Sequence, residues 1–130
     1  MSATPARPVT GALSPNRTRW LVPAAVAVAI LIATSWPSPP AMPNNSDKVV
    51  HFTAYGLLGA SVGWAARTRG LRGLLRYAVV VSMFGAADEW HQQFIPNRRM
   101  DARDWIADTA GAVAGLSLVT ALARRRESVA

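Results

Sequence analysis

The stretch "WIADTAGAVAGLSLVTALA", from Trp105 to Ala123, is an apolar run whose single acid, Asp108, lies close to its start. As a helix rising about 1.5 Å per residue, the run is long enough to cross most of a hydrocarbon core. It does not alternate with period two, so a strand is not indicated. Gly111 and Gly115 form a GxxxG step, which allows another helix to approach closely. We therefore predict a membrane-spanning helix.

Three further apolar runs precede this one, from Trp20 to Trp36, from Val49 to Ala66, and from about Leu74 to Trp90. Tryptophans bracket the first run, as is common at bilayer interfaces. A cleavable signal peptide is a competing interpretation of that run, but no small-x-small cleavage pattern follows cleanly. We expect an all-α integral membrane protein, a bundle of four transmembrane helices.

The composition of the chain agrees with a membrane protein. Hydrophobic residues make up 51% of the 130 residues and charged residues only 16%, which is unusual for a soluble domain. The net charge of +7 comes from short basic clusters between apolar runs. Nucleic-acid binding would favour a basic face interleaved with aromatic residues, so it is not indicated. The chain has no cysteine, which excludes disulfides, thiol nucleophiles and thiolate metal sites.

The basic residues predict an orientation in the membrane. Ten arginines fall on one side of the predicted spans: Arg7, Arg17, Arg19, Arg67, Arg69, Arg72, Arg76, Arg124, Arg125 and Arg126. The other side holds Lys48, Arg98, Arg99 and Arg103, together with six of the seven acids. By the positive-inside rule, both termini are cytoplasmic in a multi-pass protein of the cytoplasmic (inner) membrane. We expect a disordered basic leader (1–19), a four-helix membrane domain (20–123) and a basic tail (124–130).

Polar residues recur at helical spacing near the extracytoplasmic ends of the second, third and fourth predicted helices. Residues three or four apart share a helix face, so these stripes predict one polar pocket between the helices. The candidate pocket residues are Asp47, Lys48, His51, Tyr55, Asp88, Glu89, Gln92, Arg98, Asp104 and Asp108. We expect an ion-paired network in which Arg98, brought back by Pro96, reaches the acids of the third and fourth helices while Arg99 stays in solvent. The competing interpretations are solvated interfacial acids and a helix-packing role for His51.

Two motifs carry a resemblance to a known family. The segment "DKVVHFTAYGLLG" (47–59), followed by "DEWHQQFIPNRRMDARDWIADTAGAVAG" (88–115), resembles the VanZ-like family of small bacterial membrane proteins, which is named for an accessory protein associated with teicoplanin resistance. Asn97 stands where members commonly have glycine after the proline, and asparagine also tolerates left-handed turns. Asp108 stands where members often have asparagine, which adds a possible negative charge.

Three classes of function follow from these residues. The first is a binding or accessory protein whose pocket, with Lys48 and Arg98 as cations, engages a lipid headgroup, a cell-wall intermediate or a glycopeptide. The alternative is an intramembrane hydrolase of a lipid-linked substrate that uses a metal ion or a histidine–carboxylate pair. His51, His91, Glu89 and Asp108 are suitable residue types for such an ion, but their spacing matches no metal motif. The third class is a structural subunit whose ion pairs only orient helices.

Overall fold

Five helices follow one another along the part of the chain that the structure, a computed structural model, describes, namely residues 15–38, 40, 42–43 and 46–129. They are α1 (Pro15–Thr18), α2 (Leu21–Thr34), α3 (Ser46–Ala66), α4 (Gly70–Gln92) and α5 (Ala102–Val129). No strand occurs among the described residues, which confirms the all-α class. Of the predicted leader, residues 1–14 lie outside the described residues, and α1 occupies 15–18. The predicted tail continues α5 as far as Val129.

Three of the four predicted spans form helices long and apolar enough to cross a membrane, namely α3, α4 and α5. The first apolar run gives a shorter helix, because α2 has 14 residues and is therefore only about 21 Å long. A hydrocarbon core is about 30 Å thick. The chain leaves the helix just before Pro37, since proline disfavours helical backbone at the residue before it.

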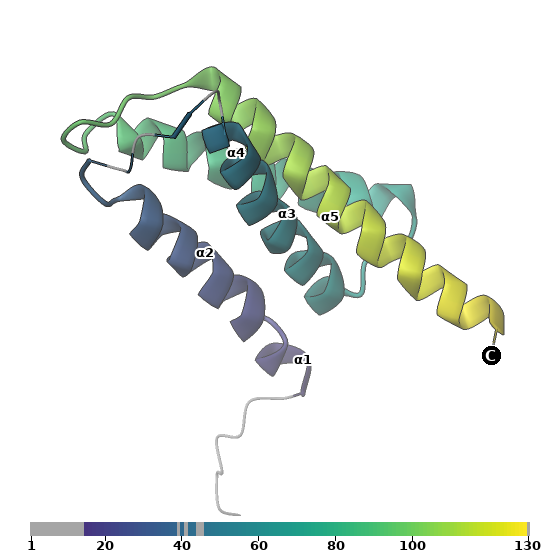
Figure 1. Ribbon diagram of the computed structural model, residues 1–130. Helices are drawn as coiled ribbons and strands as arrows, with labels where there is room; N and C mark the ends of the chain where they lie inside the picture. The colour runs from purple at the N-terminus through teal and green to yellow at the C-terminus, as the bar shows by residue number, and fades with distance from the viewer. Residues whose placement is uncertain (1–14, 39, 41, 44–45, 130) are drawn as a thin grey trace, which may run out of the picture.

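Helices α3 and α5 form the closest pair, and α3 lies between α2 and α5 (Figure 1). Small residues at the contact allow the two backbones to approach. A methyl group added at Gly111 would overlap the carbonyl of Phe52, and one added at Gly115 would overlap the carbonyl of Gly56. The expected role of the GxxxG step in close helix approach is confirmed. A buried apolar cluster continues from this contact toward α2 and α4: Ile30, Tyr55, Leu58, Val62, Ala78, Val81, Ala112 and Leu116.

A tight connection makes α3 and α4 antiparallel. Arg67 has a left-handed backbone (φ 51°), while its N–H donates to the carbonyl of Trp64 at 3.4 Å and the N–H of Thr68 to that of Gly63 at 3.0 Å. These two hydrogen bonds form a Schellman motif, which satisfies carbonyls at the helix end. Arg19 fixes the start of α2 beside the same end of α3, because its Nη2 donates to the Trp64 carbonyl at 2.6 Å.

In the helical bundle, several acidic side chains are buried while many large apolar side chains are exposed. Asp88, Glu89 and Asp108 are 1%, 2% and 0% exposed, whereas Leu57 and Met83 are 61% and 68% exposed. A water-soluble domain hides apolar side chains and exposes acids. An apolar exterior around buried acids is the pattern expected of helices in lipid.

The glycine contact between α3 and α5 leads to the first testable prediction. Gly111→Ala and Gly115→Ala should each lower the free energy of unfolding in detergent by about 1–3 kcal/mol, because backbone atoms block the new methyl group. Gly56→Ala is the matched control on the same interface, since its methyl group would lie 3.5 Å from the Gly111 carbonyl oxygen, an ordinary contact. Equal thermal stability of all three variants would contradict this packing.

Candidate functional site

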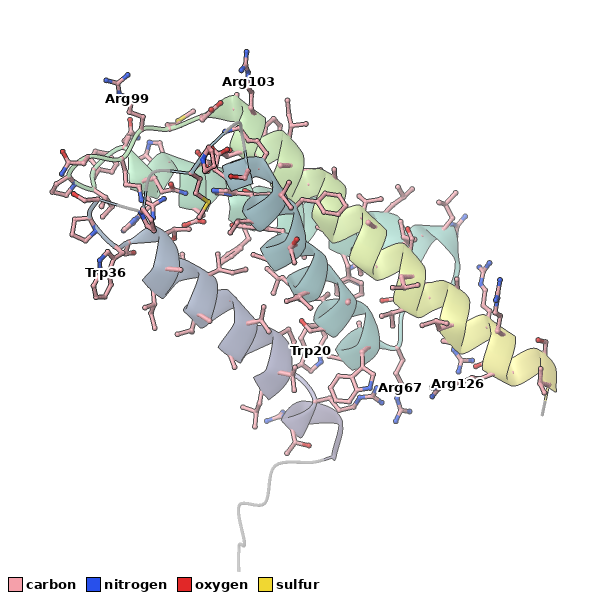
Figure 2. All side chains as sticks on the ribbon, in the orientation of Figure 1. Trp20, Trp36, Arg67, Arg99, Arg103 and Arg126 are labelled. Carbon is pink, nitrogen blue, oxygen red and sulfur yellow. The ribbon has the colours of Figure 1, made fainter. Side chains whose placement is uncertain are left out.

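The polar side chains gather at one end of the bundle, here called the loop end. It consists of the C-terminal ends of α2 and α4, the N-terminal ends of α3 and α5, and the connection 93–101 between α4 and α5. Figure 2 shows Trp36, Arg99 and Arg103 at this end, and Trp20 and Arg126 far from it. The expected polar stripes therefore come from helix ends that the antiparallel topology brings together.

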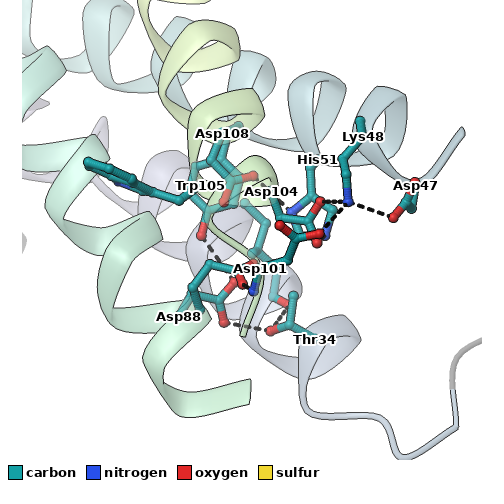
Figure 3. A network of polar contacts seen from close by, with 12 residues as sticks. Thr34, Asp47, Lys48, His51, Asp88, Asp101, Asp104, Trp105 and Asp108 are labelled. Carbon is teal, nitrogen blue, oxygen red and sulfur yellow. Dashed lines mark hydrogen bonds and ion pairs between the residues drawn. The ribbon is translucent and has the colours of Figure 1, made fainter. Parts of the chain in front are cut away.

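His51 and Asp108 form the central contact of the loop end (Figure 3). The Nδ1 atom of His51 lies 2.9 Å from Oδ1 of Asp108, and the Asp108 side chain is completely buried. On the other side of the ring, Nε2 of His51 lies 3.8 Å from Oδ2 of Asp104. Asp104 and Asp108 are one helical turn apart on α5, so each places its carboxylate near a different ring nitrogen of His51.

Lys48 joins three acids at the edge of this contact. Its Nζ lies 2.9 Å from Oδ2 of Asp47 and 3.1 Å from Oδ2 of Asp101, and it also pairs with Oδ1 of Asp104. Asp101 precedes α5 and caps it, because its Oδ1 accepts a hydrogen bond from the N–H of Arg103 at 2.8 Å. This hydrogen bond and the Lys48 ammonium hold the pKa of the Asp101 carboxyl below its usual range.

Glu89 of α4 binds the backbone at the end of the connection 93–101. Its Oε2 accepts a hydrogen bond from the backbone N–H of Asp101 at 2.9 Å, and its Oε1 accepts one from Nε2 of Gln92 at 3.1 Å. The buried carboxylate of α4 therefore holds the start of α5 in place. A charge-assisted hydrogen bond of this kind is roughly twice as strong as a neutral one.

Asp88 is held by two hydroxyl groups. Thr34 donates to its Oδ1 at 2.7 Å and Tyr55 to its Oδ2 at 3.1 Å. Thr34 also donates to the carbonyl of Ile30 within α2, so the hydroxyl is shared between its own helix and the acid. These contacts link α2, α3 and α4 around one carboxylate.

Arg98 does not make the contacts expected from the sequence. Its Nη2 and Nε donate to the carbonyls of Ala33 and Trp36 at 3.1 and 3.3 Å, and its Nη1 lies 3.5 Å from Oε1 of Gln92. No ion pair joins it to an acid among the described residues. The expectation that Arg98 bridges the acids was wrong, because its guanidinium donates instead to one carbonyl in the last turn of α2 and one just beyond it, where the helix dipole favours a cation. Asn97, just before it, has a left-handed backbone (φ 61°), as expected at this glycine position.

The ten predicted residues therefore divide into three groups. The first group lies around the central contact and consists of Lys48, His51, Tyr55, Asp88, Glu89, Asp104 and Asp108. The second is Asp47, which reaches the first group only through Lys48. The third is Gln92 and Arg98, in which Gln92 links Glu89 to Arg98 at the end of α2.

Sequence analysis missed Thr34, Asp101 and Trp105 as members of the loop end. The position of Thr34 in the last turn of an apolar run was the available signal. Asp101 had the form of an N-cap preceding a helix. The sequence marked Trp105 as the first residue of an apolar run, but its indole N–H donates to the carbonyl of Ser82 at 3.0 Å and thereby links α5 to α4. No signal in the sequence indicated that hydrogen bond.

An apolar groove of about 370 Å³ opens between α2 and α3 and ends at the polar side chains. Its lining residues are Val26, Ala29, Ile30, Ala33, Thr34, Val50, His51, Ala54 and Leu57. Thr34 and His51 are the two polar residues of this lining, and both contact buried acids. The apolar groove therefore reaches the central contact of the loop end through His51.

The histidine and carboxylate side chains around the central contact are also of the types that bind metal ions. His51, Glu89 and Asp108 each offer one ligand atom, and these atoms lie within 4.8 Å of one another. The exposed His91 does not belong to this group.

The corrected position of Arg98 gives a second prediction. Arg98→Gln should lower the free energy of unfolding by about 1.5–3 kcal/mol, the range for hydrogen bonds to charged groups. Hydrogen exchange should increase at residues 30–36, because the lost hydrogen bonds belong to the end of α2. Arg99→Gln is the control, since the Arg99 side chain is exposed. Faster exchange around Asp104 and Asp108, with residues 30–36 unchanged, would contradict this role.

Comparison with known proteins agrees with this architecture. The family model described as VanZ/LLP1 matches residues 5–123. No significant match was found among the curated proteins or the solved structures. The matched region contains both charged motifs and all residues around the His51–Asp108 contact. The chain belongs to the VanZ/LLP1 family.

Proposed function

We propose that this chain is a multi-pass protein of the cytoplasmic membrane that binds an amphiphilic envelope molecule at its loop end, in an accessory role in the cell envelope or in glycopeptide resistance. The observation that carries the proposal is the apolar groove between α2 and α3, which ends at Thr34 and His51. An acyl or prenyl chain in this groove would place its headgroup beside the buried acids. Ligand sites commonly combine an apolar lining with a few placed polar groups.

The orientation in the membrane is part of the proposal. The arginines from Arg67 to Arg76 and from Arg124 to Arg126 lie at the end opposite the buried acids. The positive-inside rule then directs that end to the cytoplasm and the loop end to the exterior. We propose α2 as the fourth span, with Trp20 and Trp36 at the two interfaces and some local thinning of the bilayer.

The cations available to an anionic headgroup differ from those expected. Lys48 is paired with three acids, and Arg98 donates to the carbonyls of Ala33 and Trp36. Arg99 and Arg103 are exposed, and among the described residues neither guanidinium forms a close ion pair or a hydrogen bond. We infer that they attract the phosphate or carboxylate of an approaching ligand, and that the interior of the site interacts with its hydroxyl or amino groups.

A lipid or a lipid-linked molecule fits these features best. A phospholipid and a lipid-linked cell-wall intermediate both combine a long apolar chain with an anionic headgroup. A glycopeptide such as teicoplanin is the other possible ligand implied by the family resemblance. The groove favours the lipid-linked molecules, because its lining is apolar except at its end.

The orientation can be tested with introduced cysteines, since the chain has none of its own. A membrane-impermeant maleimide added to intact cells should label Asn97→Cys, because the loop end faces outward. It should label Arg67→Cys only after the cells are permeabilised. Labelling of Arg67→Cys but not Asn97→Cys in intact cells would reverse the proposed topology.

Ligand binding can be tested by filling the groove. Ala54→Leu places additional volume in its wall and should reduce lipid retention in native mass spectrometry about tenfold, corresponding to about 1.4 kcal/mol. Ala86→Leu, at an exposed position of α4 outside the groove, is the control. Phospholipid, a lipid-linked cell-wall intermediate and teicoplanin serve as separate probes. Undiminished lipid retention by Ala54→Leu, or binding of teicoplanin alone, would exclude the groove as the lipid site.

A further inference from the structure

The geometry points to a divalent transition-metal site formed by Nδ1 of His51 and carboxylate oxygens of Glu89 and Asp108. These three side chains come from three different helices, α3, α4 and α5. Their ligand atoms lie within 4.8 Å of one another. The inference does not depend on the proposed lipid ligand, because ion binding is measurable without any lipid present.

The distances suit an ion after a small adjustment. Nitrogen and oxygen ligands lie about 2.0–2.2 Å from Zn²⁺, so two ligands at a tetrahedral angle are separated by about 3.4 Å. Nδ1 of His51 and Oδ1 of Asp108 are 2.9 Å apart. Binding would separate these two atoms by about half an ångström and draw the Glu89 carboxylate, whose ligand atom lies within 4.8 Å of the other two, toward them.

An unsatisfied buried atom provides an independent indication of a missing partner. Oδ2 of Asp108 has no hydrogen-bond partner although the side chain is completely buried. The carboxylate faces α4, since a Cβ added at Gly85 would lie 3.4 Å from Oδ2. Glu89 follows Gly85 by one helical turn on the same face of α4. The free oxygen of Asp108 is therefore directed at the helix that supplies the third ligand.

The balance of charge also calls for a cation. Four acids at the loop end are buried, namely Asp88, Glu89, Asp104 and Asp108. Among the described residues, Lys48 is the one lysine or arginine paired with any of them. A group of buried carboxylates is costly without compensating positive charge. A divalent ion between Glu89 and Asp108 would supply two positive charges where the excess is greatest.

The surroundings of His51 indicate the class of metal. Metal-bound histidines usually direct the other ring nitrogen at a carboxylate, and here Nε2 lies 3.8 Å from Oδ2 of Asp104. Asp104 is in turn held by Lys48. One imidazole and two carboxylates suit Zn²⁺ or Mn²⁺ better than Mg²⁺, which prefers oxygen ligands and water. Three protein ligands also leave a coordination position open for a water molecule or a ligand oxygen.

The test uses the full chain in detergent, treated with EDTA, freed of the chelator and titrated with ZnCl₂ or MnCl₂ in a calorimeter. The wild-type protein should bind one equivalent, confirmed by elemental analysis after dialysis. His51→Gln, Glu89→Gln and Asp108→Asn should each weaken binding at least about tenfold, since even outer partners of metal ligands are worth 10- to 100-fold. Circular dichroism establishes that each variant retains its helices.

Two matched controls separate this site from surface binding. His91→Gln removes the other histidine, and Asp47→Asn removes an acid at the same end that contacts only Lys48. Both should bind the ion as the wild type does. Wild-type protein that retains no stoichiometric metal would overturn the inference, and protons would then balance the buried acids. Loss of binding in His91→Gln alone would overturn it as well.

Discussion

The hydrogen-bonding needs of the buried Asp108 side chain determine which faces of α3 and α5 are turned toward each other. Asp108 lies on a helix apolar enough to cross a membrane and is completely buried, so its partners must come from other helices. His51 of α3 meets it at 2.9 Å. The helical face of α5 that carries Asp108 also carries Gly111 and Gly115. Turning Asp108 toward His51 therefore places the glycines against the backbone of α3, so the polar contact and the close packing require the same arrangement.

The sequence predicts features that depend on local chemistry. The apolar runs predicted the helices α3, α4 and α5, and the helical period identified the faces of His51 and Asp108 that meet. The GxxxG step predicted the close approach that Gly111 and Gly115 allow. These predictions succeed because hydrophobicity and the spacing of residues along one helix need no knowledge of the connecting loops.

Features that depend on the path of a loop were not predicted. Arg98 has a long side chain that can reach either carboxylates or carbonyls, and the connection 93–101 directs it to the end of α2. Lys48 was expected to pair with acids of the site and also to serve as a cation for a ligand, yet its ammonium is shared among Asp47, Asp104 and Asp101, which the loop places ahead of α5. Thr34 was overlooked because a hydroxyl group can bond to its own helix, and only the tertiary structure shows that it also reaches Asp88.

The central claim is that His51 and Asp108 act as one unit between α3 and α5. The most direct measurement is a double-mutant cycle of His51→Gln and Asp108→Asn, with the free energy of unfolding measured in detergent for the wild type, both single variants and the double variant. If the contact exists, the double variant should be more stable than the sum of the single changes implies, with a coupling energy of at least about 1 kcal/mol. Additive changes within about 0.5 kcal/mol would show that the two side chains do not interact and would contradict this account of the loop end.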